Sequence, residues 1–579
     1  MKKIRLILSH VKQYTKYLLL TPVFSIIESA MGTVTPIITA KLVDEGIQGG
    51  NLDVVKKMAL FYVLTTLFNA GIGMLGGICS ARAGVGFSTN LRQALYYKVQ
   101  EFSFANIDKF STASIVTRCT SDVNNIQMAL MQVVRMLVRV PASIIFAMIM
   151  AFRTGGKMAL IFLLVMPVLG VSLGFISAKV HPIFQEMFRK TDNLNNIVRE
   201  NVRSIRVVKG FIREDYEIQK LKAATRAIYD NNWKAQKIMS LNMPIMSLCM
   251  NTCTLLISWL GAKMIIQGVD NFTVGNLQML LSYTMQILSS LMSVSMMYVM
   301  LTQAAAAVNR VYDILVEKST ITDPEDPIFE VPDGSVQFEN VDFSYSGDED
   351  RLSLKDVSLK INSGETIGIL GGTGSGKSSL VSLIPRLYDV TEGDLKVGGI
   401  DVRQYDLTAL RDSVAVVLQN NVLFSGTIKE NLRWGKEDAT DEELVEVCEM
   451  ACADEFIRQF PDGYDTLLDQ GGTNVSGGQK QRLCIARALL KKPKIIIFDD
   501  STSAVDTKTD ARIRQALKAY IPETTKIIIA QRVASVHDAD KILILDNGKV
   551  DGFDTPENLL KTNKIYQEVY YSQTQGGLE

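Results

Sequence analysis

The first half of the chain contains long runs without a single charged residue. Met58–Ala81 has 24 such residues, Met158–Ala178 has 21 and Ile238–Ala262 has 25. A helix needs about 20 predominantly apolar residues to cross the hydrocarbon core of a bilayer. These runs therefore predict transmembrane helices, in agreement with an apolar fraction of 47% for the whole chain.

Three further runs bring the predicted spans to six. Tyr17–Ala40 and Met128–Phe152 are interrupted by only one and two charged residues. Asn271–Asn309 is free of charge and, at about 1.5 Å per residue, is longer than a ~30 Å hydrocarbon core, so its helix is expected to continue into the cytoplasm. The long connections 82–127 and 179–237 are rich in Lys and Arg, which favours a cytoplasmic location for them and for both termini.

The charged residues inside these spans are Glu28, Arg135 and Arg139. Such groups are costly in lipid and are expected to face protein or water. From the sequence, Glu28 is able to attract a cationic compound, whereas the two arginines are expected to extend to the inner membrane edge.

A stripe of methionines lies within the last predicted span. Met285, Met292, Met296 and Met300 recur at helical spacing, with Tyr298 nearby. Methionine is flexible and polarizable, so the stripe is compatible with a surface that accepts many apolar shapes. Ordinary helix packing explains the same spacing equally well.

The second half carries a phosphate-binding motif. Gly371-Gly372-Thr373-Gly374-Ser375-Gly376-Lys377-Ser378 fits G-x-x-x-x-G-K-[ST] between an apolar run at 366–370 and another at 380–384. In this strand–loop–helix context the backbone N–H groups surround phosphate oxygens, Lys377 adds a positive charge and the Ser378 hydroxyl coordinates Mg²⁺. The buried strand 495–499 ends in Asp499, a second expected Mg²⁺ ligand. The motif predicts binding of ATP with Mg²⁺.

A second glycine-containing motif lies between these two. The segment Asn474-Val475-Ser476-Gly477-Gly478-Gln479-Lys480-Gln481-Arg482 resembles the signature motif of ABC transporter ATPases. At the start of a helix, Ser476 and the two glycines expose N–H groups suited to the γ-phosphate of an ATP held by another subunit.

Shorter matches follow in the order of the same family. Val341–Tyr345 resembles the aromatic loop, which implies stacking of Tyr345 on adenine, although alternating aromatic residues also occur in ordinary strands. Gln419 resembles the Q-loop glutamine, and Ser503-Ala504-Val505-Asp506 resembles the D-loop. The resemblance implies that Ser378, Gln419 and Asp499 bind the Mg²⁺ ion, and that a larger group of residues binds ATP. The ATP-binding set is Tyr345, Gly371, Gly372, Thr373, Gly374, Ser375, Gly376, Lys377, Ser378, Ser379, Gln419 and Asp499.

Two catalytic positions depart from the family pattern. Asp500 stands where the family has a glutamate that polarises the attacking water, and Gln531 stands where it has the switch histidine. Aspartate is one methylene shorter, and glutamine carries no charge at any pH. The resemblance therefore implies a degenerate ATP site, although tolerated substitutions in a working site remain an alternative.

The intact signature has a consequence for assembly. In the family's head-to-tail arrangement, Ser476, Gly477, Gly478 and Gln479 serve the ATP of the other subunit. The resemblance thus implies a heterodimer with a different half-transporter that carries an intact glutamate and histidine, and an ATPase that hydrolyses efficiently only in that complex.

The predicted fold is an α-helical six-span transmembrane domain of ABC exporter type, fused to an α/β P-loop NTPase nucleotide-binding domain. We expect residues 1–316 to form the first, 317–334 a linker and 335–579 the second. The expected function is ATP-driven export of amphipathic small molecules across a bacterial cytoplasmic membrane, with the ATPase domain in the cytoplasm. Export of lipid or peptide, an ATP-gated channel and a regulatory subunit remain alternatives. The 61 basic and 61 acidic residues cancel and give no sign of nucleic-acid binding.

Overall fold

The chain divides into two compact units. The computed structural model describes residues 2–268, 271–500 and 506–575. Unit 1 comprises Met1–Gln100 and Thr112–Glu317, and unit 2 comprises Glu101–Ser111 and Lys318–Glu579. The short segment Glu101–Ser111 thus belongs to the C-terminal unit, although the sequence places it between two predicted spans.

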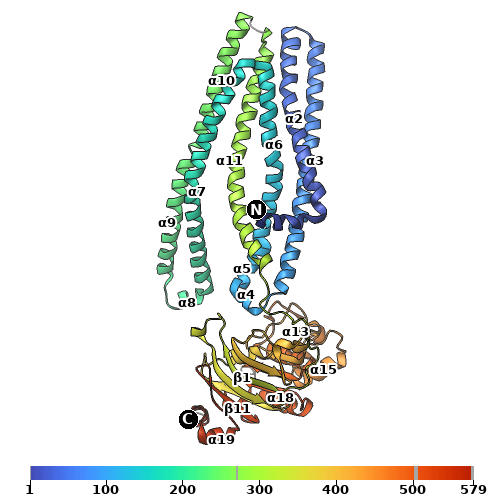
Figure 1. The fold of residues 1–579 in the computed structure, drawn as a ribbon, viewed down its shortest axis with the longest axis vertical. Coiled ribbons are helices and arrows are strands. Elements are labelled where there is room, and N and C mark those ends of the chain that lie inside the picture. The colour runs from blue at the N-terminus through green and yellow to red at the C-terminus, as the bar shows by residue number, and fades with distance from the viewer. Residues whose placement is uncertain (1, 269–270, 501–505, 576–579) are drawn as a thin grey trace. The chain divides into compact units, whose positions relative to one another are not determined.

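Unit 1 is built from long helices (Figure 1). The predicted spans fall mainly within α2, α3, α6, α7, α10 and α11. The helices are α1 (Lys2–Leu8), α2 (Thr15–Lys41), α3 (Leu52–Gln100), α5 (Thr112–Thr117), α6 (Val123–Gly155), α7 (Leu160–Arg203), α8 (Ile205–Gly210), α9 (Glu214–Met239), α10 (Asn242–Gln267) and α11 (Val274–Val316).

Four helical stretches among the described residues are long and apolar enough to cross a membrane. They are Lys2–Gln48, Leu52–Gln100, Thr112–Arg203 and Glu214–Gln267, and the third contains both α6 and α7. In α11 the side chains of Met296 and Tyr298 lie outside the described set, so the predicted methionine stripe is only partly described.

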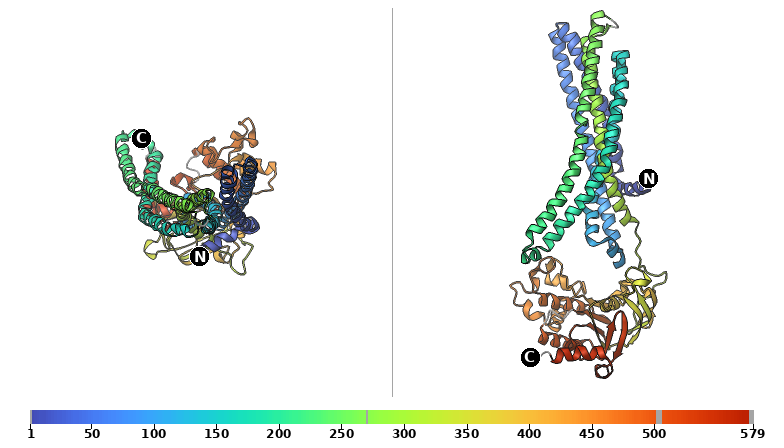
Figure 2. Two further views of the ribbon diagram at one scale, coloured as in Figure 1. Left: turned by 90° about the horizontal axis from the view of Figure 1, so that it is seen from above. Right: turned by 90° about the vertical axis from the view of Figure 1, so that its left-hand side faces the viewer.

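The helices of unit 1 pack side by side in pairs. α2 contacts α3 and α6, α6 contacts α11, and α7 contacts α9 and α10. Figure 2 shows the long helices running side by side. Polar groups between them find internal partners: the fully buried Tyr283 hydroxyl donates to the Thr33 carbonyl at 2.9 Å. Asp44 accepts from Thr273 Oγ1 at 2.6 Å and from Gly275 N at 2.7 Å, which caps the first turn of α11. Such pairing is needed where lipid offers no hydrogen bonds.

A six-stranded sheet forms the centre of unit 2. Its order is β12-β11-β3-β10-β9-β6, and the neighbouring strands from β11 to β6 are parallel. Because both faces of these parallel strands are covered, they read as nearly continuous apolar runs. The strands are β3 (Thr366–Gly371), β6 (Val414–Val417), β9 (Ile495–Asp499), β10 (Thr525–Ile529), β11 (Lys541–Asp546) and β12 (Lys549–Asp554).

Smaller sheets and short helices complete unit 2. One sheet has the order β2-β1-β4-β5, and a second pairs β7 with β8. These strands are β1 (Val336–Phe343), β2 (Leu354–Ile361), β4 (Glu392–Val397), β5 (Ile400–Asp401), β7 (Gly426–Thr427) and β8 (Leu467–Leu468). The helices are α4 (Phe104–Phe110), α12 (Lys377–Leu383), α13 (Leu407–Ser413), α14 (Ile428–Leu432), α15 (Asp441–Met450), α16 (Asp454–Ile457), α17 (Gly477–Leu490), α18 (Thr507–Tyr520), α19 (Pro556–Thr562) and α20 (Lys564–Gln575).

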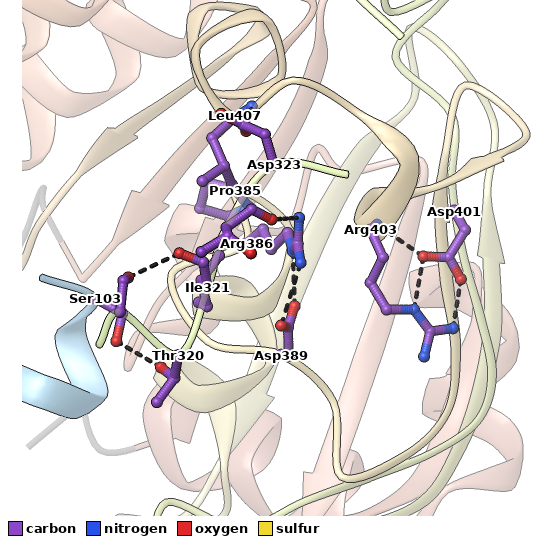
Figure 3. A network of polar contacts seen from close by, with 12 residues as sticks. Ser103, Thr320, Ile321, Asp323, Pro385, Arg386, Asp389, Asp401, Arg403 and Leu407 are labelled. Carbon is purple, nitrogen blue, oxygen red and sulfur yellow. Dashed lines mark hydrogen bonds and ion pairs between the residues drawn. The ribbon is translucent and has the colours of Figure 1, made fainter. Parts of the chain in front are cut away.

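Hydrogen bonds attach α4 to the start of the long C-terminal segment of unit 2. Asn106 Nδ2 donates to the Lys318 carbonyl at 3.1 Å, and the Ser103 and Thr320 hydroxyls lie 2.7 Å apart (Figure 3). Farther along, Asp323 accepts from the Leu407 amide at 2.9 Å. The segment that begins at Lys318 is thus held within unit 2 by specific polar contacts.

Candidate nucleotide site

The carboxyl edge of the six-stranded sheet collects the predicted ATP-site residues. The glycine-rich loop follows β3, Asp499 ends β9, Gln531 comes after β10 and Gln419 comes after β6. Because β3, β10, β9 and β6 are neighbours and parallel, their carboxyl ends meet at one edge. Ligand chemistry in open α/β sheets occurs at this edge.

The loop after β3 requires its glycines. Gly371 has φ 154°, and a Cβ there would overlap the Leu545 carbonyl oxygen. Gly374 and Gly376 have φ 81° and 98°, in the region that favours glycine. A Cβ added at Gly372 or Gly374 would meet nothing within 4 Å. The loop therefore has open space beside its backbone, as a phosphate-binding loop needs.

Lys377, at the first position of α12, folds back over this loop. Its Nζ donates to the Gly371 carbonyl at 2.9 Å and to the Gly372 carbonyl at 2.7 Å. Burial lowers the pKa of the ammonium, and the carboxylates of Asp499 and Asp500 oppose that shift. The positive charge is thus held beside the space that phosphates would enter.

Two side chains with hard oxygen atoms lie together next to Lys377. The Ser378 hydroxyl donates to Asp499 Oδ1 at 3.0 Å. Burial raises the pKa of Asp499, and the neighbouring Asp500 carboxylate adds to this rise. Mg²⁺ prefers oxygen ligands and is usually bound by one or two protein groups together with substrate phosphates. Ser378 and Asp499 fit that description.

Asp500 is tied to both glutamines of the site. Gln531 Nε2 donates to Asp500 Oδ2 at 2.7 Å, and Gln419 Nε2 donates to the same oxygen at 3.2 Å. The Asp500 backbone has φ 49°, in the left-handed region that aspartate tolerates better than most residues. Coordination of Mg²⁺ by Gln419, which the resemblance implies, stays a prediction. In the structure its amide nitrogen contacts Asp500.

The signature segment begins α17 with a capping box. The Ser476 hydroxyl accepts from the Gln479 amide at 3.3 Å, and Gln479 Oε1 accepts from the Ser476 amide at 2.9 Å. This reciprocal pair satisfies two donors at the helix start and leaves Ser476 and Gly477 exposed. The role predicted for Ser476, Gly477, Gly478 and Gln479 toward a partner's ATP stays a prediction. Of the predicted D-loop, 503–505 lie outside the described residues, and Asp506 caps α18 through the Thr509 amide at 3.0 Å.

Tyr345 stands at the phosphate loop within an aromatic cluster. Its side chain is half exposed, and its hydroxyl lies 3.0 Å from the Ser379 hydroxyl on α12. Its ring packs edge-on against Tyr388, with ring centroids 5.0 Å apart. Stacking of Tyr345 on adenine stays a prediction.

Sequence reasoning missed the contact that extends from this cluster to α4. The Tyr388 hydroxyl donates to Asp108 Oδ2 at 2.7 Å, and its ring lies near that of Phe104. Burial raises the pKa of Tyr388, and its hydrogen bond to Asp108 adds to this rise. A charge-assisted bond thus joins α4 to the residues beside the nucleotide loop. A lone tyrosine 43 positions after Tyr345 gave no local signal for it.

The fold and site define a membrane-embedded helical unit joined to a P-loop ATPase. Residues 18–291 match the family described as ABC transporter transmembrane region, and residues 354–503 match the family described as ABC transporter. The chain belongs to the ABC transporter family and has the exporter architecture.

Full-length relatives agree with this assignment. The chain is 33% identical over 566 residues to the ABC transporter ATP-binding protein YfiB of Bacillus subtilis, itself uncharacterized, with 98% of each chain covered. It is 29% identical to YgaD of the same organism, a proposed multidrug export ATP-binding/permease protein, over 97% of this chain and 98% of YgaD. The structure of a bacterial Atm1-family ABC exporter with ATP bound is similar with a TM-score of 0.81 and 26% identity, over 96% of this chain and 98% of that one.

Proposed function

We propose that this ABC exporter subunit works as one half of a heterodimer, in which its own ATP site holds nucleotide and hydrolyses it poorly. The observation that carries the proposal is the environment of Asp500. One oxygen of its short carboxylate accepts hydrogen bonds from the amides of Gln531 and Gln419. These donors compete with a water molecule for that oxygen, and an amide does not titrate at any accessible pH.

The remaining groups of the site favour retention of nucleotide. The loop 371–376 offers backbone N–H groups, Lys377 offers a positive charge, and Ser378 with Asp499 offers oxygen ligands for Mg²⁺. When bound, Mg²⁺ neutralises negative charge on the phosphates. The chain thus retains the binding groups of an ATP site, while the water-activating position carries the shorter acid and the switch position an uncharged amide.

In this proposal the exposed start of α17 contacts the ATP that the partner chain binds. The capping box holds Ser476 and Gln479 to one another, so the N–H groups of the first turn have a defined direction before any partner arrives. Preorganised donors at a helix N-terminus suit an anion such as a γ-phosphate. The partner is a different half-transporter with an intact glutamate and histidine.

The exported compounds are amphipathic small molecules, and the membrane is a bacterial cytoplasmic membrane with unit 2 on the cytoplasmic side. The described methionines of α11 support this substrate class: Met285 is exposed, and Met292 and Met300 are partly exposed. The relative YgaD, with its proposed multidrug export, agrees with it. Export of lipid or peptide, a channel and a regulatory subunit are the alternatives that a transport assay separates.

The test begins with the partner. An affinity-tagged chain is purified from its native membrane, and the copurifying half-transporter is identified by mass spectrometry. We expect poor ATP hydrolysis by the chain alone, efficient hydrolysis by the pair, and ATP-driven accumulation of an amphipathic dye in inverted vesicles that contain both. Efficient hydrolysis by the chain alone would contradict the heterodimer, and hydrolysis without dye accumulation would contradict this substrate class.

A further inference from the structure

A cluster of three charged side chains lies among the apolar helices of unit 1. Glu28 on α2 pairs with both arginines of α6: its Oε2 is 3.3 Å from Arg135 Nη2, and its Oε1 is 3.1 Å from Arg139 Nη2. We call these residues the charge triad. The pairing corrects the expectation that Glu28 attracts a cationic compound, because both carboxylate oxygens already face guanidinium groups. The arginines, expected only to extend to the membrane edge, are engaged with Glu28.

The charge triad is not neutral. Two guanidinium groups against one carboxylate leave one net positive charge. The Glu28 side chain is 12% exposed, whereas the side chains of Arg135 and Arg139 are 32% and 47% exposed. Arg135 Nε is also buried without an acceptor in the part of the chain that the structure describes. Charge within membrane spans is costly and characteristically belongs to substrate or ion pathways. The excess positive charge is therefore able to attract an anion, and Arg139 is the more exposed of the two arginines.

Helix α3 leaves room for this cluster. Gly73 and Gly77 are four residues apart and share one face of the helix. A Cβ added at Gly73 would lie 3.3 Å from Glu28 Oε1, and one added at Gly77 would lie 3.9 Å from Arg135 Nη1. The charged groups therefore pack over bare backbone.

Apolar side chains flank the accessible arginine. Met136 and Ala142, three residues before and after Arg139 on α6, are both partly exposed. A molecule with one anionic end and an apolar body could contact the guanidinium and these side chains at the same time.

We propose that the charge triad binds the anionic headgroup, a carboxylate or phosphate, of an amphipathic compound that the exporter moves. The planar fork of a guanidinium matches the geometry of both groups, and Arg139 is the accessible one. The inference rests on the proposed function for the amphipathic nature of the exported compounds, and its test uses the partner chain that the same proposal names.

The test uses the chain with its copurified partner in nanodiscs of phosphatidylcholine. The probe is dansyl-labelled undecanoic acid, and its controls are the methyl ester and the corresponding undecylamine, which share the tail and fluorophore. We expect the acid to bind more tightly than the ester and the amine to bind most weakly. Arg139→Gln should weaken binding of the acid about tenfold, the loss typical of a hydrogen bond to a charged group, and should leave the ester within about twofold.

Glu28→Gln should change binding of the acid in the opposite direction. It removes the competing carboxylate and should strengthen binding of the acid, whereas a triad that only holds α2 and α6 together would give no gain. The double variant Glu28→Gln with Arg139→Gln restores one net positive charge and should bind the acid more tightly than Arg139→Gln alone. If Glu28→Gln fails to fold by thermal unfolding, Arg139→Lys against Arg139→Gln separates charge from fork geometry.

Three results would overturn the proposal. Equal binding of acid and ester is one, and unchanged or weaker binding of the acid by folded Glu28→Gln is another. The third is competition by phosphatidylglycerol nanodiscs that depends on Arg139, which would assign the charge triad to a bilayer lipid. ATP-driven accumulation of the neutral ester in vesicles tests amphipathic export independently, so a wrong headgroup assignment and a wrong substrate class give different results.

Discussion

The combined change Asp500→Glu with Gln531→His should restore ATP hydrolysis at this chain's own site. The added methylene extends the carboxylate by about 1.5 Å, the length of a carbon–carbon bond. A displacement of about 1 Å from a reactive geometry can cost about 10²-fold in rate. The second change removes the 2.7 Å amide donor from this carboxylate and supplies an imidazole. We therefore expect a gain of up to about a hundredfold in single-turnover cleavage.

The backbone sets a cost for this change. Asp500 has φ 49°, and residues other than Gly, Asn and Asp lose roughly 1 kcal/mol in the left-handed region. This is small against a typical unfolding free energy of about 5–15 kcal/mol, so the variant should fold. A melting temperature within a few degrees of the wild type would verify this.

The assay isolates the altered site. Labelled ATP is followed through one turnover in the complex whose partner has lost its own catalytic glutamate, and Asp500→Asn with Gln531→His serves as the matched control without a carboxylate. If a folded double variant cleaves no faster than the wild type, then Asp500 and Gln531 do not limit the site and the reasoning is wrong.

Three further outcomes follow from the same geometry. Ser476→Ala should reduce turnover of the complex more than Lys377→Ala does, because the proposed heterodimer places the signature at the partner's site. A melting curve controls for the capping bond, worth about 1 kcal/mol, and equal losses would indicate that both sites share the work. Tyr388→Phe removes the hydroxyl that donates to Asp108 on α4, the helix that follows α3 in the chain. Because this bond ties α4 to the residues beside the nucleotide loop, its loss should weaken stimulation of ATPase activity by transported compound while nucleotide binding changes less than about twofold. Unchanged stimulation would show that the bond does not couple α4 to the nucleotide site. Since the pKa of Asp499 is raised, Mg²⁺-dependent binding of a fluorescent nucleotide should decline at a higher pH than it would for an ordinary aspartate. Asp500→Asn removes a neighbouring negative charge and should move that decline to lower pH. A midpoint that stays at the same pH in Asp500→Asn would contradict this.

The arrangement of the nucleotide site was largely predictable. Apolar runs such as 366–370 and 495–499 predict buried parallel strands, whose carboxyl ends must share one edge of a sheet. That constraint is enough to bring the glycine-rich loop and Asp499 together without any knowledge of loop conformation. The direction of individual side chains was not predictable, because it depends on neighbours from other segments. The amide of Gln419, for example, points at Asp500.

The helical unit shows the same limit more strongly. Charge-free runs predict where helices cross a membrane, because hydrocarbon excludes charge regardless of how the helices pack. They do not predict which face of α2 meets which face of α6. A rotation of either helix by one residue, about 100°, would separate Glu28 from Arg135 and Arg139. The ion pairs are therefore a property of the packed helices.

Both departures from the family pattern meet at one oxygen atom, because Asp500 carries it and Gln531 donates a hydrogen bond to it. This favours a site adapted to hold nucleotide over one that has lost a residue by chance. If only the acid were shortened, a histidine at position 531 would still change its charge near neutral pH. If only the histidine were replaced, a longer acid would still reach the water. In this chain the short carboxylate and the amide of Gln531 satisfy each other at 2.7 Å. A single replacement at either position supplies only one of the two catalytic groups, so the gain in rate from the pair should exceed the product of the two single gains. Additive gains from Asp500→Glu and Gln531→His in the same single-turnover assay would show instead that the two positions act independently.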